Sequence, residues 1–266
     1  MPDVYTHGHD ESVLRNHAWR TAENSAAYLL PLLRPGQRLL DVGCGPGTIT
    51  LDLGARVSPG IAVGLDASSD VVAQAEERRH EVGSANVTFC TGDVYDLAYE
   101  DASFDVVHAH QVLQHLSDPV AALRQMRRVL APGGIGAFRD GDYAAFAWAP
   151  AYPELDRWLE LYHAVTTRNG AEADAGRHLL GWAHAAGFDD VVASSSTWTF
   201  ADPASRSWWG GSWADRVLRS SFAEQAVSYG LASPADLEAI SEGWRRWSRD
   251  PDGFFAAVHG EVLVRR

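Results

Sequence analysis

The sequence predicts an α/β fold built on a doubly wound, mostly parallel sheet, and two observations support this. Short runs of Val, Ile, Leu and Ala occur without polar alternation, which is typical of parallel strands buried on both faces. Helical patterns separate these runs at the spacing of strand–helix–strand units. The first five predicted strands are Arg38–Val42, Ile61–Leu65, Val87–Cys90, Phe104–His110 and Ile135–Arg139.

Helices are predicted in the connections between these strands. They span Gly47–Val57, Ser69–Val82 and Pro119–Leu130. Residues 11–33 form a helical N-terminal region, which Pro35 and Gly36 end. The chain therefore alternates strand and helix up to about residue 140, as a doubly wound sheet requires.

The pattern changes after residue 140. A helix is predicted at Gly176–Ala186, where Gly187 provides a C-cap, and two further strands at residues 191–200 and 254–264. The segments 143–175 and 202–253 between these elements hold most of the ten tryptophans. We expect them to form aromatic helical insertions.

The composition and charge of the chain disfavour several kinds of partner and of chemistry. The chain has 266 residues and a formal net charge of −13, which disfavours nucleic acid as a partner. Its two cysteines, Cys44 and Cys90, lack CxxC spacing, so a reduced, cytoplasmic protein is expected. The N-terminus shows no signal-peptide pattern, and no apolar run is long enough for a membrane span. All 22 basic side chains are arginine, which excludes lysine-based chemistry such as Schiff bases or a P-loop.

A glycine-rich turn follows the first strand, in the sequence Leu-Leu-Asp-Val-Gly-Cys-Gly-Pro-Gly at 39–47. Gly43 and Gly45 allow a tight turn and a close approach of the backbone to a ligand, and a helix follows. The spacing is GxGxG, which differs from the GxGxxG of dinucleotide-binding enzymes. The alternative is a purely structural turn.

Two acidic residues follow the next strands. Asp66 ends the second strand about twenty residues past the glycines, where it can accept hydrogen bonds from both ribose hydroxyls. A helix N-cap is the alternative, but Ser68, Ser69 or Asp70 could take that role. Asp93, in Thr-Gly-Asp-Val at 91–94, can accept from the exocyclic amine of adenine or simply form a turn.

The fourth strand ends in His110 and Gln111, at the edge where open α/β sheets bind ligands. Leu-Ala-Pro-Gly-Gly at 130–134 then forms a turn into the fifth strand. His108 and His110 lie on one face of their strand and could ligate a metal, but no third ligand is spaced to them, so no metal is expected.

These five motifs in this order resemble class I S-adenosylmethionine-dependent methyltransferases, particularly the ubiquinone/menaquinone-biosynthesis type, over residues 36–142. The resemblance implies a Rossmann-like, seven-stranded sheet with an antiparallel final strand and S-adenosylmethionine across the first two strand ends. It places Gly43, Cys44 and Gly45 along the methionine, Asp66 at the ribose, and Asp93 with Gly92 and Val94 at the adenine. His110 and Gln111 would lie near the sulfonium. Ala67 departs from the family, where a hydroxyl or larger residue is common, which puts adenine packing there in doubt.

The rest of the chain adds weaker expectations. Stretches near Trp19, Arg139 and Trp208 resemble actinobacterial and fungal small-molecule methyltransferases, which implies a small acceptor such as an aromatic, indole-like or other secondary metabolite. Residues 1–35 are expected to form a cap in which Arg20 binds the cofactor's carboxylate. The insertions 143–175 and 202–253 are expected to cover the acceptor, with Trp208 and Trp209 against it, although their aromatics could instead only fill a core.

Methyl transfer needs a base only when the nucleophile keeps a proton of high pKa. The candidates are His110, His115 and Tyr143, with Asp140, Tyr5, His7 and His9 as further possibilities. Two other functions stay open. An NAD-dependent oxidoreductase would share the strand–turn–helix and Asp66 but is disfavoured by the GxGxG spacing, and a non-catalytic methyltransferase-like protein is disfavoured by the intact glycines and acids. The oligomeric state is not predicted.

Overall fold

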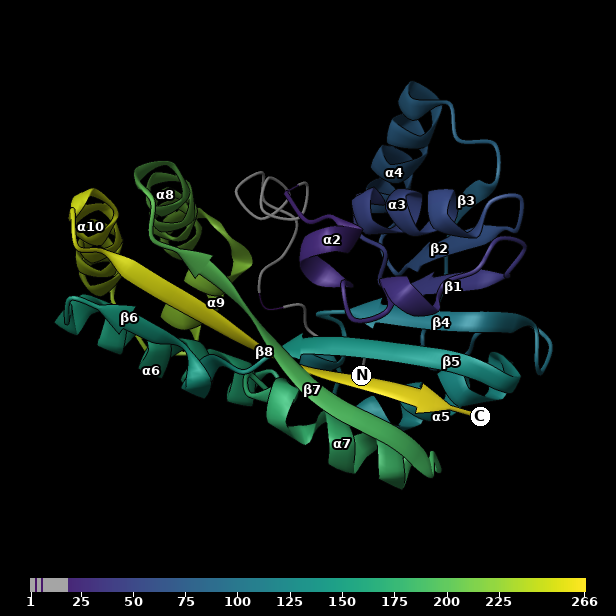
Figure 1. The fold of residues 1–266 in the computed structure, drawn as a ribbon. Helices are drawn as coiled ribbons and strands as arrows, with labels where there is room; N and C mark the ends of the chain where they lie inside the picture. Colours follow the sequence, from purple (N-terminus) through teal and green to yellow (C-terminus); the bar gives the residue numbers. More distant parts are fainter. Residues whose placement is uncertain (1–2, 4–5, 7–18) are drawn as a thin grey trace.

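The architecture is taken from a computed structural model, which describes residues 3, 6 and 19–266 (Figure 1). Three candidate bases, Tyr5, His7 and His9, lie outside the described residues, as does the part of the expected N-terminal helical region before residue 19.

A mixed sheet forms the centre of the molecule (Figure 1). Its strands follow the spatial order β3-β2-β1-β4-β5-β8-β6, and β7 pairs with β8 along the edge opposite to β5. The strands β1 to β5 are parallel, whereas β8 runs antiparallel to them, so the predicted fold class is confirmed. The strand bounds are β1 Leu39–Val42, β2 Ala62–Asp66, β3 Val87–Thr91, β4 Phe104–His110, β5 Leu130–Gly141, β6 Ala147–Ala149, β7 Asp190–Phe200 and β8 Phe254–Arg265.

Two features differ from the prediction. The short strand β6 was not predicted and brings the sheet to eight strands within the described residues. Strand β5 begins at Leu130, so the predicted turn at residues 132–134 lies inside it, where the pairing with β4 is irregular between Phe104 and Val106.

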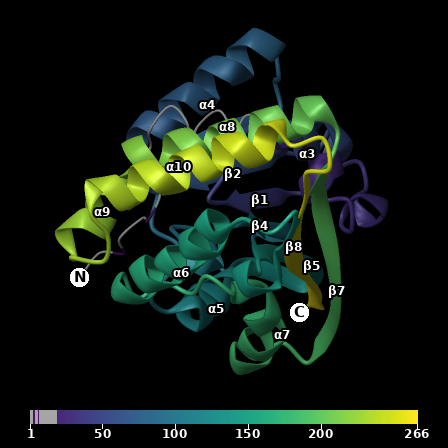
Figure 2. The same ribbon diagram turned by 90° about the vertical axis from the view of Figure 1, so that its left-hand side faces the viewer.

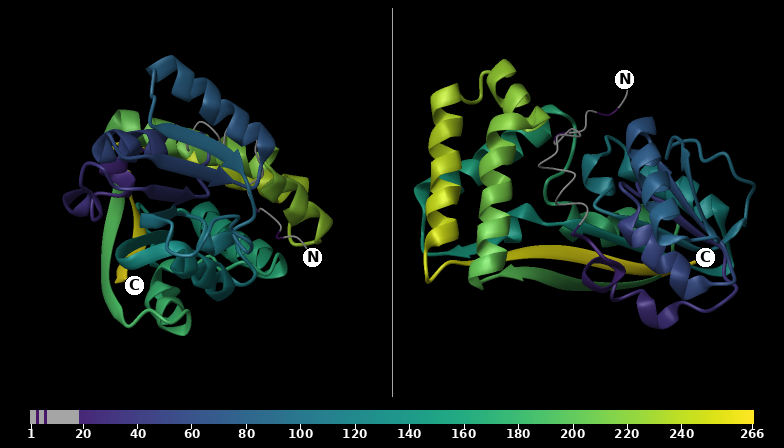
Figure 3. Two further views of the ribbon diagram at one scale, coloured as in Figure 1. Left: turned by 90° about the vertical axis from the view of Figure 1, so that its right-hand side faces the viewer. Right: turned by 90° about the horizontal axis from the view of Figure 1, so that it is seen from above.

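The long antiparallel pair β7–β8 extends beyond the parallel sheet. Strand β8 pairs with β5 only from His259 to Arg265, but with β7 from Phe255 to Arg265. On the edge that β5 no longer covers, residues 254–256 of β8 pair with β6. The hairpin therefore reaches past the end of β5 toward helices α8 and α10, as the right-hand view of Figure 3 shows.

Helices cover both faces of the parallel sheet. The helices α3 (Thr48–Val57) and α4 (Ser69–Val82) pack on one face with α2 (Ala22–Ser25), whereas α5 (Pro119–Val129) and α7 (Ala175–Ala185) cover the other. The predicted helix bounds agree with these to within one residue.

The predicted N-terminal helix is wrong for its described part. Residues 19–33 hold only the four-residue α2 and a 3-10 turn at Leu30–Leu32. Thr21 and Asn24 form a capping box that starts α2, and the helix ends after one turn because Ala26 leaves the helical conformation. Pro31 sits in the 3-10 turn, where it cannot donate a backbone hydrogen bond to a longer helix.

The tryptophan-rich segments fold into a separate helical layer at the far end of the hairpin (Figure 2). It contains α6 (Pro153–Arg168), α8 (Pro203–Arg219), α9 (Ser221–Ser228) and α10 (Pro234–Arg249). Its own core includes four fully buried tryptophans, Trp158, Trp213, Trp244 and Trp247.

Helices α8 and α10 approach closely at one of two adjacent glycines. A Cβ on Gly210 would lie 2.6 Å from Cβ of Ser248 and 3.0 Å from the carbonyl oxygen of Trp244. A Cβ on the neighbouring Gly211 would meet nothing within 4 Å. The helix pair therefore depends on a glycine at one position only.

We expect Gly210→Ala to lower the free energy of unfolding by about 1–3 kcal/mol, because the methyl group overpacks the α8–α10 contact. Gly211→Ala is the matched control and should raise it by about 0.5–1 kcal/mol, because alanine loses less backbone entropy in a helix. Urea unfolding measures both. Equal effects of the two changes would contradict the close approach at Gly210.

Candidate functional site

One cavity of about 850 Å³ lies at the carboxyl ends of the parallel strands and continues along the hairpin to α8. Its volume is in the upper part of the range for small-molecule sites. The following residues predicted at the cofactor or the acceptor line it: Arg20, Gly43, Cys44, Gly45, Asp66, Ala67, Gly92, Asp93, Val94, His110, Gln111, His115, Tyr143, Trp208 and Trp209.

The glycine loop is held against β2. Gly43 and Gly45 have φ values of +70° and +54°, which other residues rarely adopt. A Cβ on Gly43 would lie 2.3 Å from a methyl group of Val112. The amides of Gly43 and Cys44 donate to the carbonyl of Leu65, at 2.7 and 3.0 Å. These glycines therefore serve the turn, and the space above it stays open.

Asp66 joins the glycine loop to the start of α4. Its Oδ2 accepts from the Gly45 amide at 3.0 Å, and its Oδ1 accepts from the Ser68 amide at 3.0 Å. Ser68 is the N-cap of α4, with its hydroxyl accepting from the Val71 amide. Asp66 is thus not the cap, and each carboxylate oxygen keeps a second lone pair for a ligand hydroxyl.

Asp93 forms the turn that was weighed as an alternative to adenine binding. Its Oδ1 accepts from the Tyr95 amide at 2.8 Å. This bond fixes the carboxylate beside Gly92 and Val94 at the cavity wall. One oxygen in the turn leaves the other for a ligand, so the structure is compatible with both roles.

His110 is a buried, neutral histidine. Burial lowers its pKa well below the usual value, and the charges of Arg139 and Arg20 lower it further, with smaller contributions from His259 and His108. Nη1 of Arg139 lies 3.4 Å from its Nδ1. Arginine can only donate, so Nδ1 accepts and the ring proton is on Nε2.

A hydrogen-bonded chain runs from the N-terminal segment to β8. Arg20 donates to the side-chain oxygen of Gln111 at 2.5 Å, and the amide nitrogen of Gln111 lies 2.8 Å from Nε2 of His259. Nδ1 of His259 is 3.0 Å from the carbonyl oxygen of Ala257 and donates to it. Burial and the charges of Arg139 and Arg20 lower the pKa of His259 well below its usual value, so this ring is also neutral.

The polar end of the sheet is closed by a buried ion pair. Nε of Arg139 on β5 lies 3.1 Å from Oε1 of Glu261 on β8, and both side chains are buried. Ser194 and Ser196 of β7 donate to the same carboxylate. The guanidinium of Arg139 also lies 4.9 Å from the ring centre of Trp198, whose other neighbours include Arg20 at 5.7 Å.

On β1 and β4, Asp41 joins two side chains: its Oδ1 lies 2.7 Å from Nδ1 of His108, and its Oδ2 accepts from the Thr50 hydroxyl. His108 therefore has a carboxylate partner. Within the described residues, no group of three or more His, Cys, Asp or Glu side chains is placed to hold a metal. In the same part of the chain, no helix is long and apolar enough to cross a membrane.

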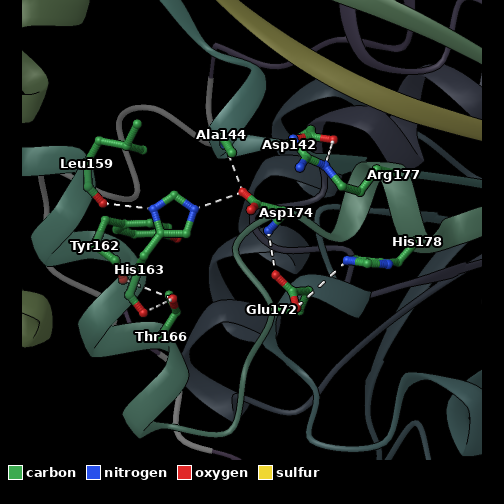
Figure 4. A network of polar contacts seen from close by, with 10 residues as sticks. All are labelled: Asp142, Ala144, Leu159, Tyr162, His163, Thr166, Glu172, Asp174, Arg177 and His178. Carbon is green, nitrogen blue, oxygen red and sulfur yellow. Dashed lines mark hydrogen bonds and ion pairs between the residues drawn. The ribbon is translucent and has the colours of Figure 1, made fainter. Parts of the chain in front are cut away.

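A polar network outside the cavity holds Asp142 and Ala144, the two residues that flank Tyr143 (Figure 4). Oδ1 of Asp174 accepts from the Ala144 amide at 2.8 Å and lies 2.9 Å from Nε2 of His163. The Tyr143 ring stacks on Tyr162 at 4.1 Å between centres. Burial raises the pKa of the Tyr143 phenol, so its hydroxyl stays protonated.

Several cavity residues were missed by sequence reasoning, among them Trp19, Trp198, Arg216 and His259. Trp198 lies on the part of the hairpin that extends past β5, and His259 lies where that part begins. The alternation of Trp198 with Thr197 and Thr199 was the available signal, but the length of the extension was not apparent from the sequence.

Comparison with known proteins agrees with this arrangement. A family model described as a methyltransferase domain matches residues 33–187. The chain is 35% identical to an uncharacterized methyltransferase of Schizosaccharomyces pombe over 98% of this chain and 96% of that protein. It is 30% identical to a probable methyltransferase of Aspergillus luteorubrus, again over 98% and 96%. The structure of the YcgJ protein from Bacillus subtilis shares the fold, with a TM-score of 0.61 at 22% identity over 92% of this chain and 99% of that chain.

Asp140, one of the candidate bases, does not line the cavity. Its Oδ1 accepts from the Gln114 amide at 3.2 Å, whereas its Oδ2 has no hydrogen-bond partner among the described residues. Burial raises the pKa of this carboxyl to about 7, although the bonds from the Gln114 and Leu113 amides and the charge of Arg139 oppose the rise. Asp140 is therefore a buried acid whose ionisation opposes folding.

Because the folded state holds this proton more tightly than the unfolded chain, the free energy of unfolding should fall as pH rises from about 4 to about 7. Asp140→Asn cannot ionise, so its stability relative to the wild type should increase between about pH 5 and pH 8. Urea unfolding at both pH values measures this. The exposed Asp189→Asn is the control and should show no such change, and a constant difference for Asp140→Asn would contradict the assignment.

Proposed function

The chain belongs to the class I S-adenosylmethionine-dependent methyltransferases, and from this we propose that it methylates a small molecule carrying a flat, apolar ring. The resemblance seen in the sequence, including that to the menaquinone-biosynthesis type, is confirmed. The cofactor is S-adenosylmethionine, and the reaction is S-adenosylmethionine-dependent methylation. An NAD-dependent oxidoreductase and a non-catalytic protein are set aside by this family membership.

We assign the cofactor to the half of the cavity formed by the ends of β1, β2 and β3. Asp66 would accept from the ribose hydroxyls, Asp93 with Gly92 and Val94 would hold the adenine, and the loop of Gly43, Cys44 and Gly45 would follow the methionine. Ala67 and Val71 add apolar contact. The fit rests on the two carboxylates at the cavity wall, each fixed by backbone amides with lone pairs to spare.

Three further residues complete this assignment. We place Arg20 at the methionine carboxylate, because its guanidinium lines the cavity and is held beside the end of β4 by its bond to Gln111. His110 and Gln111 follow β4 and lie between the two halves of the cavity. The bound cofactor supplies a methyl group on a positively charged sulfur.

The acceptor would occupy the other half, and the observation that carries this proposal is its aromatic wall. Trp198 of β7 and Trp208, Trp209 and Trp213 of α8 line this half together with Phe146. Tryptophan faces suit a flat ring. The stacking of Trp209 on Phe200 at 4.3 Å shows that these side chains also belong to the core of the helical layer, so we propose the acceptor role in addition to this core role.

None of the three candidate bases has the setting of a strong base. Burial and the charges of Arg20 and Arg216 lower the pKa of His115 to about 3, and its Nε2 lies 3.0 Å from the Gln114 amide nitrogen. Tyr143 is a neutral phenol, and the Nδ1 of His110 faces Arg139. We therefore propose that the enzyme works by alignment and exclusion of water, with His110, His115 and Tyr143 orienting the acceptor.

Residues 1–35, 36–142 and 143–266 would act as cap, cofactor-binding core and acceptor-binding remainder of one domain. We further propose that the enzyme acts in the cytoplasm on a soluble metabolite, without nucleic acid or membrane as a partner. The two free cysteines and the net charge of −13 support this.

Asp66→Ala should weaken binding of S-adenosylhomocysteine by about 1–3 kcal/mol, because the ribose hydroxyls lose a charged acceptor and the Gly45 amide loses its partner. Calorimetry measures the affinity, and Asp252→Ala, on the loop before β8, is the control. An unchanged affinity in Asp66→Ala would remove this residue from the cofactor site.

Trp208→Ala should raise the KM of the acceptor about tenfold or more while leaving S-adenosylhomocysteine affinity unchanged, because Trp208 is half-buried at the cavity and its ring carries acceptor contact. The acceptor is found by screening phenols, enols and indoles for release of S-adenosylhomocysteine. Loss of stability without any change in KM would show that Trp208 only fills the core.

A further inference from the structure

The ionisable residues of the cavity are divided by charge. Within the described lining, the acidic side chains are Asp3, Asp41, Asp66 and Asp93. Three of them lie on or just after the ends of β1, β2 and β3, and Asp3 accepts a hydrogen bond from the Tyr95 hydroxyl beside them. The aromatic half holds no acidic lining residue in the described chain. Its charged lining residue is Arg216, on α8. One half thus suits a cation and the other an anion.

His110 presents a donor at the boundary of these halves. Its side chain is 5% exposed and lines the cavity, and its Nε2 has no hydrogen-bond partner among the described residues. Since Arg139 faces Nδ1, the single proton of the neutral ring is on Nε2. A buried N–H without a partner costs free energy unless a ligand accepts from it.

The groups around His110 favour an anion there. Arg139 on β5 contacts its ring, and Arg20 of the N-terminal segment lowers its affinity for a proton. His259 on β8 and His108 on β4 are its other titratable neighbours, and Glu261 accepts from Arg139 on the side away from Nη1. With Arg20 assigned to the methionine carboxylate and Glu261 paired to Arg139, the His110 N–H remains for the acceptor.

We propose that the acceptor is an acidic hydroxyl compound, a phenol or enol on a flat ring, that binds as its oxyanion with the oxygen accepting a hydrogen bond from Nε2 of His110. This inference rests on the proposed methyltransferase function and names its substrate class. It also explains why no strong base is present. His110 selects the acceptor that has already lost its proton.

The chemical step then needs no proton transfer. A lone pair of the oxyanion forms the new O–C bond to the methyl carbon, the C–S bond breaks, and its electron pair stays on sulfur. The products are a neutral methyl ether and S-adenosylhomocysteine. An unactivated carbon would have to lose a proton, for which this site offers no strong acceptor, and a neutral amine would become a cation in the half whose charged lining residue is Arg216.

The test uses p-nitrophenol as a probe, because its anion absorbs visible light and its neutral form does not. The full-length protein is saturated with S-adenosylhomocysteine and the bound probe is titrated by absorbance. We expect the pKa of bound p-nitrophenol to fall about one to two units below that of the free probe, since a hydrogen bond to a charged group is strong.

Variants identify the donor. His110→Phe keeps a flat ring without the N–H and should abolish most of the shift, whereas His110→Asn keeps an N–H and should retain part of it. The exposed His184→Phe is the control and should leave the shift intact. In 15N spectra of histidine-labelled protein, the resonances lost in His110→Phe or His110→Asn should be those of an Nε2–H ring that does not titrate near neutral pH.

Several results would overturn the proposal: no binding of the probe, binding as neutral phenol, an equal shift in His110→Phe, or an Nδ1–H or titrating ring in the spectra. Calorimetry of S-adenosylhomocysteine on the same samples distinguishes a failure of the proposed cofactor site from a failure of the proposed acceptor class. If that ligand does not bind, the proposed cofactor site fails. If it binds but the probe does not bind as its anion, only the acceptor class is wrong. Should His110→Phe not fold, the wild-type titration and His110→Asn still decide.

Discussion

The antiparallel pairing of β8 with β7 is the constraint on which the two-part cavity depends. Strand β5 accompanies β8 only to His259, whereas β7 accompanies it to Phe255. Because the hairpin stays paired beyond the parallel sheet, it carries Trp198 past the end of β5, places His259 opposite the last residue of β5, and supports α8 on the far side. Without this extension the carboxyl edge of the sheet would offer a cofactor crevice but no wall for a second ligand.

The hairpin also explains the polar character of the site. One face of the sheet is apolar where α2 and α3 cover it and becomes polar toward the cavity, with His110 on β4 opposite Arg139 on β5, which is opposite Glu261 on β8. A buried ion pair is costly unless its remaining hydrogen bonds are satisfied. Ser194 and Ser196 satisfy Glu261, and Trp198 covers Arg139. The same pair directs Arg139 at Nδ1 of His110 and so fixes the tautomer that faces the cavity.

The cofactor half was predictable from sequence because its signals are local. The glycines, Asp66 and Asp93 each follow a buried strand within a few residues, and parallel strands bring their carboxyl ends to one edge. Strand bounds such as Phe104–His110 and helix bounds such as Ser69–Val82 followed from periodicity alone. The N-terminal helix failed because apolar residues and good helix formers did not reveal the break after Ser25.

The acceptor half was less predictable because it is made by long-range pairing. Trp208 and Trp209 were placed correctly at the cavity from the position of their insertion, but Trp198, His259 and Arg216 enter it through the register of β7 with β8 and the approach of α8. The role of His110 likewise depends on Arg139, which lies 29 positions away in the chain and on the neighbouring strand. Sequence position identified the residue, but only its partner determines which ring nitrogen carries the proton.

The central claim is that one cavity holds the cofactor over β1 to β3 and the acceptor along the hairpin. A crystal structure of the protein with S-adenosylhomocysteine tests it most directly. The account predicts ribose hydroxyls within hydrogen-bond distance of Asp66, adenine beside Asp93, and a sulfur atom that faces His110 and the tryptophan-lined half. A ligand bound in the aromatic half, or with its sulfur turned away from His110, would contradict it.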